Sequence, residues 1–184
     1  AARHNSQSKD GIKVTLIESP DVNIVGVGEG TWPTMRTTLA KIGISETTFI
    51  RHCDASFKQG SKFSAWCTGK DNDHYYHPFS LPQDYNNTNL VPYWQPQQQQ
   101  VSFANAVSYQ GYLCDNNLAP KENTTAEYAA IANYGYHLDA GKFVTLLQQH
   151  CTQQIGVKHI KDHVVAVKND ENQYIAAIST QDNG

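Results

Sequence analysis

Two short stretches carry the side chains with the clearest potential for chemistry. The first, GVGEGT at residues 26–31, places three glycines in five residues, and Pro33 follows it closely. Such a turn lets the backbone approach a ligand closely. Thr31 and Pro33 suit the start of a helix, whose first amides favour anionic groups. The same pattern also fits a tight connection that binds nothing.

The second stretch, DASFK at residues 54–58, offers the amine of Lys58 beside an aromatic residue. An amine enclosed by apolar walls can bind and orient a small reactive species. Phe57 and Trp66 would supply those walls if the fold brings them to the amine. The competing interpretation is an ordinary surface lysine on a strand.

The segments between these stretches predict the elements that position them. Met35, Leu39 and Ile42 recur at helical spacing, which predicts a helix over 34–42 that ends at Gly43. A second short helix is expected to run from Ser45 to Cys53. Alternating apolar residues over 57–66 predict one strand, with Lys58 and Lys62 on the same face.

Together the two stretches resemble the flavin-dependent tryptophan halogenase family. Members carry V-G-E-[GA]-T-x-P, which is VGEGTWP here at residues 27–33, and an aromatic-lysine pair in N-[GA]-[AS]-[FY]-K farther along the chain. Asp54 stands where the family usually has Asn. A third segment, YHLD at residues 136–139, is similar to the family's Y-H-x-D.

An acidic residue ends an apolar segment near the start of the chain. Residues 12–17, IKVTLI, predict a buried strand, and Glu18 follows it. In dinucleotide-binding folds such a carboxylate hydrogen-bonds the adenosine ribose; a solvated strand-end carboxylate fits equally well. The preceding strand and its G-x-G-x-x-G turn do not occur, so we expect a fragment that begins inside the first crossover helix.

The predicted fold class is α/β, a partial FAD/NAD(P)-binding Rossmann-like three-layer fold with a loop-rich insertion. Residues 1–66 are assigned to a partial FAD-binding domain with the lysine motif and a strap, which is the irregular link between Ser19 and Thr31. Residues 67–127, rich in Asn, Gln, Pro and Tyr, form the insertion on the substrate side. Residues 128–184 return to the FAD-binding domain, through a helix in the pattern over 126–154 and three short strands.

The resemblance implies a function for these elements. It implies an FADH2-dependent halogenase that uses reduced FAD, O2 and a halide (chloride or bromide) to make hypohalous acid, which is relayed to Lys58 for halogenation of tryptophan or a related aromatic. Lys58 is the expected catalytic residue. The expected cofactor-binding residues are Glu18, Ser19, Gly28, Glu29, Gly30 and Val164.

The same resemblance implies the molecular context. It implies a separate flavin reductase that supplies FADH2, allows a homodimer, and suggests antibiotic biosynthesis. The fragment alone is expected to be inactive, because the family's assisting glutamate and halide site belong to a missing C-terminal part. Two alternatives remain open: a flavin-dependent aromatic monooxygenase on the same fold, and a non-catalytic nucleotide-binding fragment.

Composition narrows the classes of partner. A net charge of −3 without a basic stripe argues against nucleic acid, and no apolar run reaches the roughly 18 residues of a membrane span. Four cysteines without C-x-x-C are expected to be free thiols in a reducing, cytoplasmic compartment. His74 and His77 lack the other ligands of a metal site, so no metal is expected. His159 and His163 are expected to be exposed.

Overall fold

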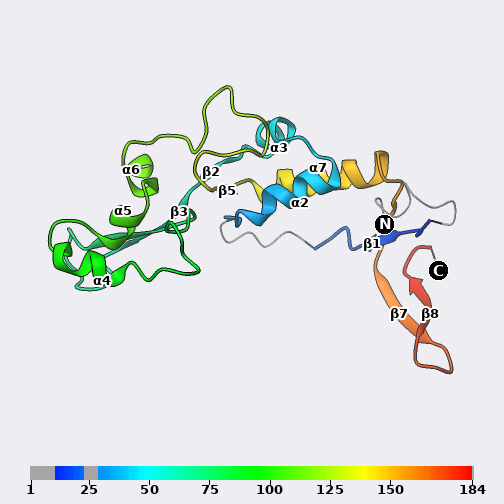
Figure 1. Ribbon diagram of the computed structural model, residues 1–184. Helices are drawn as coiled ribbons and strands as arrows, with labels where there is room; N and C mark the ends of the chain where they lie inside the picture. The colour runs from blue at the N-terminus through cyan, green and yellow to red at the C-terminus, as the bar shows by residue number, and fades with distance from the viewer. Residues whose placement is uncertain (1–10, 23–28, 184) are drawn as a thin grey trace. The chain divides into compact units, whose positions relative to one another are not determined.

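The structure is a computed structural model that describes residues 11–22 and 29–183 (Figure 1). It divides the chain into two compact units, the first comprising Ala1–Val27 with Ala140–Gly184 and the second Gly28–Asp139. The functional assignment of 1–66, 67–127 and 128–184 stays a prediction. Across the described ranges, no helix has the length and apolar character needed to cross a membrane.

The first unit contains a parallel strand pair and an antiparallel hairpin. Strand β1 (Thr15–Glu18) pairs in parallel with β6 (Lys158–Lys161), and helix α7 (Ala140–Gln153) leads into β6. Strands β7 (Val164–Asn169) and β8 (Ile175–Thr180) form the hairpin, coloured orange to red in Figure 1. These strands confirm the predicted ones.

Two predictions are wrong in detail, one for β1 in this unit and one for the segment before α7, which belongs to the second unit. Ile12, Val14 and Leu16 are 38–52% exposed, because β6 is the one sheet partner of β1 among the described residues. The helical pattern over 126–154 yields a helix only from Ala140 onward. Ahead of it the chain alternates a buried tyrosine with a glycine, and this segment forms strand β5 (Gly135–His137).

A buried aspartate holds the end of the hairpin. Asp162 accepts hydrogen bonds from the backbone amides of His163 (2.7 Å) and Asn183 (3.1 Å), and from the Asn183 side chain (2.7 Å). Burial opposes the charge, but these bonds, with one from Thr180, hold the pKa of Asp162 well below its usual range. The carboxylate therefore fixes where the chain turns after β8.

The second unit begins with two helices that the sequence predicts well. Helix α2 (Thr34–Ile42) ends at Gly43, whose φ of +83° is the left-handed conformation that favours glycine. Helix α3 (Glu46–His52) is capped by the Ser45 side chain. The expected cap by Thr31 is wrong: α2 begins after Pro33, and the Thr31 hydroxyl accepts from the amide of Tyr136 instead (2.9 Å).

The strand predicted over 57–66 is in fact two strands. Strand β2 (Ser56–Lys58) pairs with β5, whereas β3 (Gly60–Ser64) pairs with β4 (His74–Pro78), which was not predicted. The chain passes so close to the neighbouring strand at Gly60 that a Cβ there would overlap the His77 carbonyl. Lys58 and Lys62 therefore belong to different ladders and do not share the face of one strand.

The insertion has the loops and short helices that its composition predicts. Its helices are α4 (Val91–Trp94), the 3₁₀ turn η1 (Gln95–Gln97), α5 (Phe103–Val107) and α6 (Gln110–Asp115). The fully buried Gln110 accepts from the amide of Ser80 (2.7 Å) and donates to the carbonyl of Asn133. One side chain thus joins the insertion to the segment that leads into β5.

Strand β5 is crowded along its backbone. A Cβ added to Gly135 would lie 2.5 Å from the carbonyl oxygen of Thr31, far inside van der Waals contact. We predict that Gly135→Ala lowers the free energy of unfolding by about 1–3 kcal/mol, because backbone must move to admit the methyl group. Urea-induced unfolding measures the loss. Ser56→Ala, at an exposed position on β2, is the control, and equal stabilities for the two variants would contradict the crowding.

Candidate functional site

The candidate site is built around β5, which has a partner along each edge. On one edge the strap residues bond to it. The amide of Thr31 donates to the carbonyl of Tyr136 (2.7 Å), and the amide of Leu138 donates to the carbonyl of Glu29 (3.2 Å). Gly30 thereby forms a β-bridge with His137. On the other edge lies β2, whose Lys58 faces Gly135 in the register. The described end of the glycine-rich motif, Glu29–Thr31, thus meets the DASFK and YHLD motifs in one backbone array.

The Lys58 amine lies beside two neighbouring aromatic rings. Its Nζ is 5.6 Å from the ring centroid of Trp32 and 5.7 Å from that of Phe79, and the two centroids are 5.5 Å apart. Both distances fall within the range over which a ring attracts a cation. Lys58 is half-buried, whereas Trp32 is 63% exposed, so one side of this arrangement is open. The group can donate hydrogen bonds to a small species held beside an aromatic molecule.

The residues expected to surround Lys58 lie elsewhere. Phe57 points to the opposite face of β2, as neighbouring strand residues must, and its ring packs edge-on against Tyr134 at 5.0 Å. Trp66 is 72% exposed and contacts Phe63 at 5.8 Å. The apolar walls of the amine are therefore Trp32 and Phe79, and the prediction of Phe57 and Trp66 is wrong.

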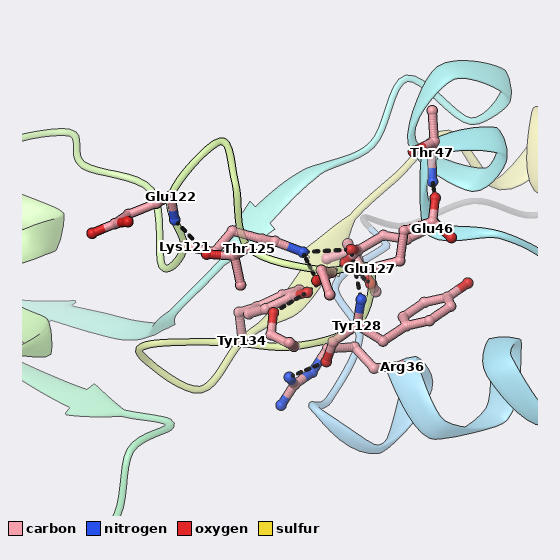
Figure 2. Close-up of polar contacts among 12 residues, drawn as sticks. Arg36, Glu46, Thr47, Lys121, Glu122, Thr125, Glu127, Tyr128 and Tyr134 are labelled. Carbon is pink, nitrogen blue, oxygen red and sulfur yellow. Dashed lines mark hydrogen bonds and ion pairs between the residues drawn. The ribbon is translucent and has the colours of Figure 1, made fainter.

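A buried carboxylate holds the opposite face of β5. Glu46, at the start of α3, is 3% exposed. Its Oε2 accepts from Lys121 Nζ (2.7 Å) and the amide of Tyr128 (2.8 Å), and its Oε1 accepts from the hydroxyls of Tyr136 (2.7 Å) and Tyr134. Figure 2 shows Lys121 and Tyr128 converging on this carboxylate. One side chain thus fixes both tyrosines that flank Gly135.

The hydrogen bonds decide the ionisation of this cluster. Burial alone would raise the pKa of Glu46, but the bonds from Lys121, Tyr134, the Tyr128 amide and Tyr136 outweigh it and hold that pKa below its ordinary value. Burial and the neighbouring negative charge raise the pKa of Tyr128 to about 12 and also raise those of Tyr134 and Tyr136. All three tyrosines therefore stay protonated at neutral pH, and Tyr134 and Tyr136 remain donors to Glu46.

The acidic end of β1 carries a second group of polar residues, within the first unit. Glu18 Oε2 lies 2.7 Å from His159 Nε2, and Ser19 Oγ lies 3.2 Å from His163 Nδ1. His163 Nε2 also pairs with Asp21 at 2.8 Å. The expectation of two exposed histidines is wrong for His159, whose side chain is only 10% exposed, because its ring lies between Gln148 and Glu18.

The cofactor residues expected from the resemblance fall into three groups. Glu18, Ser19 and Val164 belong to the first unit, where Val164 begins β7 directly after His163. Glu29 and Gly30 belong to the second unit, in the strap beside β5. Gly28 lies outside the described residues. Their roles toward a flavin remain predictions.

Sequence reasoning missed Trp32, Phe79, His137 and Glu46. Trp32 and His137 lie within the VGEGTWP and YHLD motifs, so an aromatic or imidazole side chain inside a motif was a usable signal. Phe79 and Glu46 reach the site through pairing of β3 with β4 and through tertiary packing. No local pattern in the sequence marks such contacts.

Comparison with known proteins identifies relatives of this chain. The family model described as tryptophan halogenase matches residues 1–184. Tryptophan 7-halogenase RebH of Lentzea aerocolonigenes is 30% identical over 183 residues, covering 91% of this chain and 34% of RebH. Tryptophan 6-halogenase ThaL of Streptomyces albogriseolus is 27% identical, covering 92% of this chain and 35% of ThaL.

Solved structures give the same relationship. A tryptophan halogenase from Shewanella frigidimarina NCIMB 400 is 55% identical with a TM-score of 0.88, covering 94% of this chain and 34% of that one. Tryptophan 6-halogenase SttH from Streptomyces toxytricini is 27% identical with a TM-score of 0.82, covering 94% and 34%. These likenesses confirm the predicted fold class, a partial Rossmann-like α/β fold. The chain spans about a third of the length of these relatives.

The Glu46 cluster makes a stability prediction. Glu46→Gln removes the charge and leaves the Lys121 ammonium, whose side chain is 10% exposed, without its counter-ion. Breaking a buried pair in this way costs about 3–5 kcal/mol, and we expect a loss of this size in urea-induced unfolding. Glu122→Gln is the matched control, because Glu122 is exposed and points away from Glu46 in Figure 2.

The same variant has a defined pH dependence. Because the folded-state pKa of Glu46 lies below its ordinary value of 4.5, its contribution is complete above that pH and is lost as the pH falls below it. The difference in stability between the wild type and Glu46→Gln should therefore shrink in acid. A difference that stays constant from neutral pH down to pH 3 would contradict the assignment.

Proposed function

Because this chain belongs to the tryptophan halogenase family, we propose that the full-length protein is an FADH2-dependent halogenase that acts on tryptophan or a related aromatic. In this proposal Lys58 holds hypohalous acid, formed with O2 and a halide, beside the substrate ring. The position of the Lys58 amine beside Trp32 and Phe79 carries the proposal. It joins a motif lysine to the kind of apolar surface that an indole would contact.

The chemistry of Lys58 follows from this position. Its ammonium can donate a hydrogen bond to the oxygen of hypohalous acid and leave the halogen directed at a substrate carbon. The rings of Trp32 and Phe79 offer faces against which an aromatic substrate can stack. Orienting two reactants in this way lowers the entropic part of the barrier. In this proposal Lys58 acts through its position. Lys62, on the neighbouring strand β3, lies over a different ring, with its Nζ 5.3 Å from the centroid of Tyr76.

The first unit offers a fitting place for the adenosine part of FAD. Glu18 ends a parallel strand, its side chain is 45% exposed, and a carboxylate that pairs with His159 still has acceptor positions for ribose hydroxyls. Ser19 and the backbone of Val164 lie along the same edge, since His163 contacts Ser19 and precedes Val164. Gly28, Glu29 and Gly30 in the strap are proposed for the flavin end. Bound reduced FAD would supply the oxidising chemistry with O2.

The remaining elements of the proposal concern the protein's context. A separate flavin reductase would provide FADH2, and chloride or bromide would be the halide. We place the protein in the cytoplasm, in agreement with cysteines that form no disulfide among the described residues. A homodimer and a role in antibiotic biosynthesis complete the proposal.

The lysine can be tested directly in the full-length protein. Lys58→Ala should oxidise FADH2 at the wild-type rate, because flavin chemistry does not use the amine, but should form at least about 100-fold less halogenated tryptophan. Flavin absorbance and chromatography of the products measure the two steps. Lys62→Ala, which removes a lysine of the neighbouring β3–β4 ladder, should match the wild type in both flavin oxidation and product formation. Normal yield of halogenated product from Lys58→Ala would exclude the proposed role.

The ribose contact is tested separately. Glu18→Gln should weaken FAD binding by roughly 10- to 100-fold, the range expected for loss of a charged hydrogen-bond acceptor. Titration of flavin absorbance on the full-length apoprotein measures the change. Glu171→Gln, in the exposed β7–β8 turn, is the control and should bind normally. Equal dissociation constants for the two variants would remove Glu18 from the cofactor site.

A further inference from the structure

The Lys58 amine lies directly against the backbone of Gly30. A Cβ built on Gly30 would be 2.9 Å from Lys58 Nζ and 3.3 Å from its Cδ, with the His137 ring next at 3.5 Å. Gly135, which faces Lys58 across the β2–β5 ladder, has no side chain, so the lysine can lie across β5 toward the strap. The space that a side chain would fill at residue 30 is thus taken by the reactive end of the lysine.

Residue 30 cannot move away easily, whereas the lysine can. Gly30 is held to β5 by the backbone bonds of Glu29 and Thr31 on either side of it. The atoms that a methyl group at residue 30 would meet are the far end of a flexible lysine and the edge of an exposed imidazole. An added methyl group would therefore displace the amine and leave the backbone in place.

We infer that Gly30 is a positioning residue for Lys58: the family motif admits Gly or Ala at this position, and in this chain the absence of a side chain sets where the amine sits, and therefore which carbon of the aromatic ring is substituted. This inference rests on the proposed function of Lys58. The amine now lies at nearly equal distances, 5.6 and 5.7 Å, from the Trp32 and Phe79 centroids. Ordinary contact with a Cβ begins at 3.4 Å, so an alanine would push the amine by at least about 0.5 Å and change both distances.

The neighbouring glycine shows that this effect is specific. A methyl group on Gly135 would meet the carbonyl oxygen of Thr31 at 2.5 Å, which is backbone. The same substitution is thus expected to damage the fold at position 135 and to move one amine at position 30. A side chain at position 30 would change the position of the amine, whereas a side chain at position 135 would lower the stability of the fold.

The test is Gly30→Ala in the full-length protein, with free indole and tryptophan as substrates and bromide as the halide. We expect the variant to fold, to oxidise FADH2 as the wild type does, and to change the ratio of ring-position isomers. A misplacement of about 1 Å can alter a rate about 100-fold, so a change of roughly threefold or more in the ratio is expected for half that shift. A crystal structure of the variant should show Lys58 Nζ displaced from residue 30.

A core truncation in the first unit provides the control. Leu146→Ala removes a buried side chain from α7 and should lower the yield without changing the isomer ratio, because the folded molecules keep the same amine position. An unchanged ratio or an unmoved Nζ in Gly30→Ala would overturn the inference, and so would loss of folding. If Lys58→Ala still gave product, the proposed function would fail first. If Lys58→Ala were inactive and Gly30→Ala were unchanged, only the role of Gly30 would fail.

Discussion

The candidate site depends on the hydrogen bonds along both edges of β5. This strand has three residues, yet its backbone joins the strap at Glu29–Thr31 to the strand that carries Lys58. A short edge-to-edge array of this kind is rigid only if each of its backbone groups is paired. The amide and carbonyl of Tyr136 both bond to Thr31. The lysine and the glycine-rich segment consequently hold a common frame, although 28 positions separate Gly30 from Lys58.

The two faces of this array have different physical roles. On one face the aromatic side chains of Phe57, Tyr134 and Tyr136 gather over Glu46, and burial of a charge is tolerated there because its acceptor positions are filled. On the other face, Lys58 and Gly30 meet beside Trp32 and Phe79. The alternation of side chains along a strand makes this separation possible, since Phe57 and Lys58 are direct neighbours in sequence and point to opposite faces.

Sequence reasoning was most successful where local rules decide the structure. Helix α2 ends at Gly43 and α3 begins after Ser45 as capping rules predict, and the motif spacing identified the family that the comparisons confirm. It failed where pairing between distant segments decides. The run from Phe57 to Trp66 has strand periodicity throughout, but Gly60 divides it between two partners. Likewise Tyr136 lies within the helical pattern predicted over 126–154, but it pairs with β2 as part of strand β5. The aromatic walls of Lys58 follow from these pairings and have no local signature.

The insertion is attached to the lysine-bearing array through several polar contacts, among them the Lys121–Glu46 ion pair and the pairing of β4 with β3. Gln110 joins it to the segment before β5, and the Gln59 side chain donates to the carbonyl of Leu118 (2.7 Å). The tip of the insertion, around Tyr85 and Tyr93, is highly exposed and takes no part in those contacts. Mutations can therefore accumulate at the tip with little cost to the array, and natural drift or a directed-evolution library can reshape that surface while the Lys58 amine keeps its position.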